Sequence, residues 1–251
     1  GGIMAPTVAS SPAVRHDAAM KPTILRAQAT TDDGKTMTLH EHDGSFMIRI
    51  DGVELMSTRQ HHSEERLAEL ACRPLREAQK PRVLIGGLGL GFTLRAALAC
   101  LPPDAAVTVV ELVPAVIAWN LEPAFGLGCD ALQDPRVEVI SGDVAEVLRT
   151  RRGVFDAVIL DVDNGASGLT TESNHQLYDT AGLTAAKAAL KPAGCLAVWS
   201  ADNDPEFVDR MQRCGFTVAT ERVSRYAGGA APNWLFIGRR QRSAGAGSPR
   251  C

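Results

Sequence analysis

Long apolar runs are missing from this sequence of 251 residues, and none approaches the ~20 residues that a helix needs to span a bilayer. The longest, such as residues 105–112, have the length of buried strands, so we expect no membrane partner. The first residues lack a basic stretch ahead of an apolar one, and we therefore expect no secretory signal. A basic surplus is absent too. The formal net charge is −3 at pH 7, which argues against a nucleic-acid partner.

Paired cysteine spacing is a further absence. The six cysteines are scattered with no Cys-x-x-Cys motif, so the sequence favours neither a zinc site nor a disulfide framework. The acids and histidines lack ligand spacing as well, and we expect no metal site. Free cysteines are typical of a reducing compartment, so we expect a cytoplasmic protein.

Composition and periodicity divide the chain into four parts. Residues 1–24 are rich in Ala, Pro, Ser and Thr without a sustained period, and we expect them to be disordered. Residues 25–62 are expected to form an N-terminal β-hairpin region, and residues 63–238 a single nucleotide-binding catalytic domain. Residues 239–251 mix Arg, Gly, Ser and Pro, which indicates a flexible tail.

Turn and cap residues place the first elements. Asp43-Gly44 separates two short alternating runs, which predicts a hairpin. Ser63 precedes a helical pattern over residues 64–77 and is expected to be its N-cap.

From residue 82, short apolar strands alternate with helices, and residues 216–223 and 234–238 close the chain as an expected antiparallel pair. This alternation predicts an α/β fold with a mostly parallel seven-stranded sheet covered by helices on both faces.

Ligands of such sheets bind at the carboxyl ends of the strands, so the residues that follow each strand carry the functional signal. The first strand is followed by a glycine loop that opens directly into a helix. Glycine lets the backbone turn sharply and lets a ligand approach without a Cβ in the way, although a purely structural turn explains the motif as well. We expect four of its glycines to contact a nucleotide: Gly86, Gly87, Gly89 and Gly91.

The second strand ends in Glu111, about two dozen residues after the glycines, where a carboxylate is placed to accept hydrogen bonds from a ribose diol. Leu112 follows it and is expected to contact the nucleotide. The third strand leads to Asp143 and Val144, which suit an adenine amino group and an adenine face. A helix-capping role is the alternative for Asp143.

The fourth strand leads into Asp161-Val162-Asp163-Asn164-Gly165. Acids at the open end of a central strand are costly unless they are paired, solvated or used, so Asp161 and Asp163 are the candidate catalytic residues. A structural turn is the alternative for Asp163-Asn164-Gly165. A glycine loop followed in order by these acids favours an adenosyl-sulfonium donor over a nicotinamide cofactor.

The stretch from Met47 to Ala201 resembles the spermidine synthases, the aminopropyltransferase branch of the class I methyltransferase fold, which is Rossmann-like. Segments that carry the resemblance are 48–55, 85–95, 109–111, 142–143, 155–161 and 178–183. Gly-Gly-Leu-Gly-Leu-Gly and Asp-Val-Asp-Asn-Gly are also similar to a bacterial group labelled spermidine synthase-like.

The resemblance implies that Glu111 holds the ribose, Asp143 the adenine, and Asp161 the region around the reactive chain of the donor. It also implies substrate contacts from Gln60, Asn164 and Tyr178. The N-terminal hairpin region would cover the site and mediate a homodimer.

This sequence departs from the family at three places. Leu90 stands where the family carries an acid for the amine of decarboxylated S-adenosylmethionine, and Asn164 stands where it carries a second gate acid. Ser63-Glu64-Glu65 replaces Tyr-His-Glu. Each lost carboxylate removes a charge-assisted bond worth ~1.5–3 kcal/mol to a cationic amine.

Three functions follow from these features. Because of Leu90, we expect an S-adenosylmethionine-dependent methyltransferase that acts on a small molecule and binds the intact donor at least as well as the decarboxylated one. The alternatives are an aminopropyltransferase that uses decarboxylated S-adenosylmethionine and a catalytically silent nucleotide-binding module.

Overall fold

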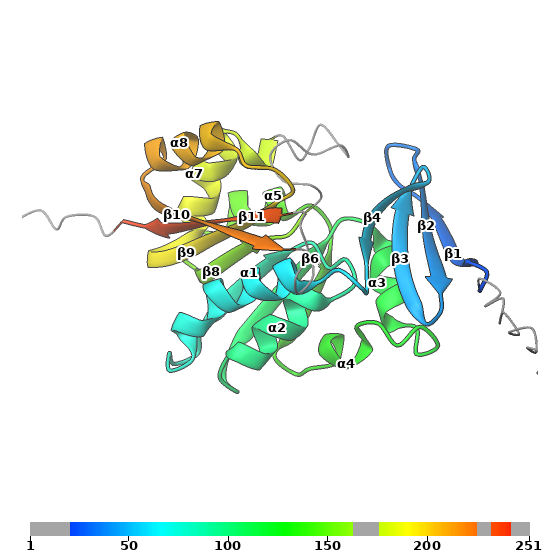
Figure 1. Ribbon diagram of the computed structural model, residues 1–251. Coiled ribbons are helices and arrows are strands. Elements are labelled where there is room, and N and C mark those ends of the chain that lie inside the picture. The colour runs from blue at the N-terminus through cyan, green and yellow to red at the C-terminus, as the bar shows by residue number, and fades with distance from the viewer. Residues whose placement is uncertain (1–20, 163–175, 225–231, 242–251) are drawn as a thin grey trace, which may run out of the picture.

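The computed structural model describes residues 21–162, 176–224 and 232–241. In it a small N-terminal sheet lies beside a larger sheet layered between helices (Figure 1). Among the described helices, none combines the length and apolar character that crossing a bilayer requires.

The N-terminal sheet has four antiparallel strands in the order β1-β2-β3-β4: β1 (Ile24–Thr30), β2 (Thr36–His42), β3 (Ser45–Ile50) and β4 (Val53–Ser57). The predicted hairpin is confirmed as β2–β3, whose turn residues Asp43 and Gly44 have φ of 50° and 72°. The two outer strands are half exposed and alternate only weakly, which is why the sequence pattern predicted a hairpin and not a sheet.

The larger sheet has seven strands in the order β10-β11-β9-β8-β5-β6-β7. Its members are β5 (Arg82–Gly86), β6 (Ala106–Glu111), β7 (Val137–Ser141), β8 (Phe155–Leu160), β9 (Leu190–Ser200), β10 (Phe216–Ser224) and β11 (Pro232–Arg240). The first five are parallel and β11 is antiparallel to both of its neighbours, so the predicted fold class is confirmed. β11 runs to Arg240, two residues into the expected tail.

Helices cover both faces of this sheet. The described helices are α1 (His62–Cys72), α2 (Phe92–Cys100), α3 (Pro114–Leu121), α4 (Cys129–Leu132), α5 (Val144–Thr150), α7 (Thr180–Ala189) and α8 (Pro205–Arg213). Two apolar cores result, one shared by α1, α2 and the N-terminal sheet and one beneath α5, α7 and α8 (Figure 1). Burial on both faces explains why the strands read as short apolar runs.

The start of α1 corrects the expectation for Ser63. The N-cap is His61, and Ser63 is buried inside the first turn. Its hydroxyl accepts hydrogen bonds from Trp199 Nε1 at 3.0 Å and Asn233 Nδ2 at 2.9 Å, so it ties α1 to β9 and β11. The predicted cap is wrong. The sequence could not reveal the observed role of Ser63, because both partners are more than a hundred positions away.

The strand order places the functional edge. The chain leaves β5 toward β6 on one side and leaves β8 toward β9 on the other, although β5 and β8 are neighbours. Loops that part in this way leave a crevice at the carboxyl ends of the two strands. The glycine loop and Asp161 follow these two strands.

Candidate functional site

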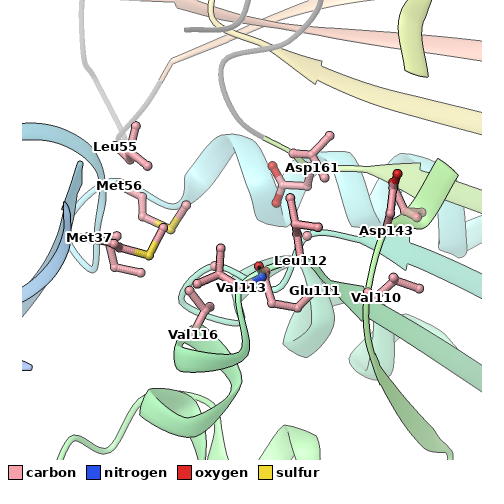
Figure 2. Close-up of a pocket in the computed structure, with 16 residues that line it drawn as sticks. Met37, Leu55, Met56, Val110, Glu111, Leu112, Val113, Val116, Asp143 and Asp161 are labelled. Atoms are coloured by element: carbon pink, nitrogen blue, oxygen red, sulfur yellow. Dashed lines mark hydrogen bonds between the residues drawn. The ribbon is translucent and has the colours of Figure 1, made fainter. Parts of the chain in front are cut away.

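A pocket of about 710 Å³, open to solvent, lies between the N-terminal sheet and the carboxyl ends of β5, β6, β7 and β8 (Figure 2). Its lining residues are Met37, Ile48, Leu55, Met56, Gly87, Gly89, Val110, Glu111, Leu112, Val113, Val116, Gly142, Asp143, Val144, Asp161 and Val162. The structure therefore brings seven of the predicted cofactor residues to one pocket: Gly87, Gly89, Glu111, Leu112, Asp143, Val144 and Asp161.

The glycine loop presents Gly87 and Gly89 to the pocket and its leucines to the core. Gly87 has φ of 88°, and a Cβ there would lie 2.2 Å from the carbonyl oxygen of Asp161. Gly89 has φ of 51°, and a Cβ there would lie 2.8 Å from Met56 Sδ. Leu88 and Leu90 are buried, the latter only 2% exposed. Glycine is therefore required at 87 and 89, whereas Leu90 serves packing.

The two outer glycines have other places. Gly86 ends β5, and its carbonyl accepts the backbone N–H of Asp161 at 2.9 Å. Gly91 is the N-cap of α2 with φ of 79°. Neither lines the pocket, so both shape the loop that Gly87 and Gly89 present.

Asn120 on α3 supports the loop from behind. Its side-chain amide donates to the carbonyls of Gly89 at 2.8 Å and Val116 at 2.9 Å, and the residue is fully buried. The sequence analysis missed this residue because one asparagine in an apolar helix has no motif around it.

Glu111 is a buried carboxylate, 8% exposed, that is fixed by the backbone. Its two oxygens accept N–H groups from Leu88 at 2.9 Å and Val113 at 2.8 Å. Backbone donors compensate for the loss of water around a buried charge, and a carboxylate can accept about four hydrogen bonds. The group is thus held in one orientation at the pocket surface.

Asp143 has the capping role that the sequence analysis gave as its alternative, and its contact with adenine stays a prediction. Its side chain caps α5 by accepting the N–H of Ala145 at 2.7 Å, and the residue also lines the pocket. Val144 and Leu112 stand near it as apolar surfaces, and Leu112 is 44% exposed.

Asp161 lies where β8 opens toward the glycine loop. Its backbone N–H donates to Gly86, and its carboxylate accepts a hydrogen bond from the hydroxyl of Thr93 on α2. Figure 2 shows Asp161 and Glu111 facing the same space, opposite Met37 and Met56; Asp161 follows β8 and Glu111 ends β6, the two strands on either side of β5.

The wall that the N-terminal sheet contributes is apolar throughout: Met37, Ile48, Leu55 and Met56. We call it the apolar wall, and the residues from the ends of β5 to β8 the strand-end wall. All ionisable residues among the described ones that line the pocket are acids from the strand-end wall: Glu111, Asp143 and Asp161. The site therefore suits a ligand that is positively charged and partly apolar.

The predicted catalytic and substrate residues other than Asp161 are not tested by this lining. Asp163 and Asn164 lie outside the described residues, and Gln60 and Tyr178 are described but do not line the pocket. Gln60 follows β4, and its backbone N–H donates to the Ser57 carbonyl at 3.1 Å. Tyr178 is buried in the core beside Phe207, and its hydroxyl donates to the carbonyl of Val162 at 3.3 Å. The substrate contacts of these residues stay predictions.

Comparison with known proteins confirms the resemblance. No protein-family model matches this chain. It is 35% identical over 119 residues to polyamine aminopropyltransferase 1 of Streptomyces coelicolor, covering 46% of this chain and 22% of that protein. It is 33% identical over 128 residues to spermidine synthase of Dictyostelium discoideum, covering 47% of this chain and 41% of that protein.

The crystal structure of spermidine synthase from Thermotoga maritima superposes with a TM-score of 0.70 at 20% identity, over 87% of this chain and 74% of that one. At this identity the likeness shows the fold, which is that of a spermidine synthase. The matched part of this chain spans less than half the length of both curated relatives. The relatives support aminopropyl transfer better than the methyl transfer that the sequence analysis placed first.

Proposed function

We propose that this protein is a spermidine synthase-like aminopropyltransferase whose pocket binds decarboxylated S-adenosylmethionine. The observation that carries the proposal is the charge of the pocket, whose described ionisable lining residues are all carboxylates. The decarboxylated donor carries a sulfonium and an ammonium, both cationic. The intact donor adds a carboxylate, which would enter an acidic pocket without a basic partner from the described lining residues.

The strand-end wall suits the nucleoside part of this donor. Glu111 would accept the ribose hydroxyls, because its carboxylate is already oriented by Leu88 and Val113. Asp143 would accept the adenine amino group while Leu112 and Val144 pack against the ring. Gly87 and Gly89 would let the donor approach the backbone closely, since a Cβ at either position has no room.

The reaction needs positioning and the removal of one proton. The acceptor nitrogen would attack the aminopropyl carbon next to sulfur, and the carbon–sulfur bond would break with its electron pair passing to sulfur. Methylthioadenosine would leave, and the proton of the acceptor nitrogen would pass to Asp161. Such a displacement requires in-line geometry more than covalent help, which a fixed donor and one carboxylate supply.

Leu90 was the reason for placing methyl transfer first, because it supplies no acid for a donor amine. Its side chain lies in the apolar core and is absent from the pocket lining, so it places no group where a donor amine would bind. Asp161, which does line the pocket, would serve that amine. We keep the predictions of a small-molecule acceptor, a homodimer and a cytoplasmic location.

The nucleoside product tests the proposal. The purified protein is incubated with each donor and a series of mono-, di- and triamines, and the products are identified by mass spectrometry. We expect methylthioadenosine from the decarboxylated donor. S-adenosylhomocysteine formed from the intact donor alone would establish methyl transfer, and binding of either donor without turnover would establish a silent module.

A further inference from the structure

We infer that Thr93 is a positioning residue that sets the direction of the Asp161 carboxylate. The inference rests on the proposed function, in which Asp161 acts on the acceptor proton. Thr93 lies in the first turn of α2, 68 positions before Asp161. It does not line the pocket.

The contact is a buried one. Thr93 is 2% exposed, and its hydroxyl donates to Oδ2 of Asp161. A threonine in a helix is restricted to about two χ1 rotamers, so the buried hydroxyl of Thr93 has few directions available. The hydroxyl therefore limits the directions in which the Asp161 carboxylate can point.

The backbone of Asp161 is fixed independently of this hydroxyl. Its N–H donates to the Gly86 carbonyl at 2.9 Å, and its own carbonyl lies against Gly87. These contacts fix the position of the Asp161 Cα. They do not fix the χ1 angle, which depends on the contacts of the side chain. The Thr93 bond to Oδ2 restricts that rotation and so determines where Oδ1 points.

The N-terminal end of α2 also lies near the Asp161 carboxylate, because Thr93 belongs to the first turn of that helix. The positive end of the helix dipole interacts favourably with a carboxylate, so the helix helps to hold the group at this place.

Removing the hydroxyl while keeping the shape tests the inference. In Thr93→Val we expect kcat to fall by up to ~10²-fold, the size of effect that misplacing a reacting group by about 1 Å can have. The dissociation constant of the nucleoside product, methylthioadenosine, should stay nearly unchanged, because Thr93 does not line the pocket. The pH–rate profile is measured on the same preparations.

Two further variants separate positioning from packing. Thr93→Ser keeps the donor and should restore most of kcat and the wild-type pH profile, even if it is less stable. Thr184→Val makes the same substitution at an exposed helical threonine whose hydroxyl bonds to its own helix, and should leave all readouts unchanged. If Thr93→Val does not fold, Thr93→Ala removes the same hydroxyl and is measured in its place.

The outcomes distinguish this inference from the proposed function. A wild-type protein that releases no methylthioadenosine overturns the proposed function. Turnover in the wild type together with equal kcat and an equal pH profile in Thr93→Val overturns the positioning role alone. A loss in Thr93→Val that Thr93→Ser does not restore shows packing and overturns it as well.

Discussion

The two walls of the pocket are built from different kinds of residue. The strand-end wall carries glycines and carboxylates held by backbone hydrogen bonds, as at Glu111 and Asp143. The apolar wall carries side chains from β2, β3 and β4, such as Met37 and Met56. The difference indicates that the strand-end wall binds by directed polar contacts, while the apolar wall excludes water and covers the ligand.

The largest effect is expected at Asp161. Asp161→Asn should keep the fold and most of the affinity for methylthioadenosine, which lacks the donor amine, while lowering turnover by ~10²–10⁴-fold, the usual range for a positioned acid–base group. Melting and single-turnover rate are measured on the same preparation. Asp209→Asn, an exposed change on α8, is the control. An unstable but active Asp161→Asn protein would give Asp161 a structural role instead.

Glu111 should determine affinity more than rate. Glu111→Gln keeps the shape but removes the charge and places an amide NH2 against the backbone donors of Leu88 and Val113. Loss of a charge-assisted contact of ~1.5–3 kcal/mol should weaken donor binding roughly 10- to 100-fold, as measured by calorimetry. Unchanged affinity would show that Glu111 does not contact the ribose.

A methyl group at Gly87 should disturb the strand-end wall directly. Gly87→Ala would place a Cβ 2.2 Å from the Asp161 carbonyl oxygen, whereas Gly153→Ala would place one in open space. Both glycines have a positive φ, 88° at Gly87 and 61° at Gly153, so each variant strains the backbone and only Gly87→Ala adds the clash. We expect Gly87→Ala to be less stable than Gly153→Ala by roughly 1–3 kcal/mol in urea unfolding, the usual cost of overpacking. Equal stability would mean that the loop can move away from Asp161.

The smallest effect is expected on the apolar wall. Met56→Leu conserves volume, so donor affinity should change by less than about tenfold, within the ~1.5 kcal/mol that such exchanges usually cost. Met56→Asp brings a carboxylate to the same wall and should lower stability, since it buries a charge. A large loss of affinity in Met56→Leu would show that the apolar wall also makes specific contacts. That result would contradict the difference between the two walls described above.

Sequence reasoning found the strand-end wall and missed the apolar one for physical reasons. Glycines and acids at strand ends are unusual residues at special positions, so Gly87, Glu111 and Asp161 stand out. Met37 and Met56 have the same pattern as any core residue of a strand, and only the packing of two sheets makes them a wall.

The supporting residues were missed for a related reason. Thr93 and Asn120 act through partners that are 68 and 31 positions away, and no local pattern reports such contacts. Ser63 was misassigned because its local pattern resembles a cap while its partners, Trp199 and Asn233, come from distant strands.

A side-by-side titration of the wild-type protein with the two donors tests the central claim most directly. An acidic pocket should bind decarboxylated S-adenosylmethionine at least about tenfold more tightly than the intact donor, which corresponds to ~1.4 kcal/mol. Calorimetry at low salt gives both constants on one preparation. Tighter binding of the intact donor would contradict the proposal and restore methyl transfer to first place.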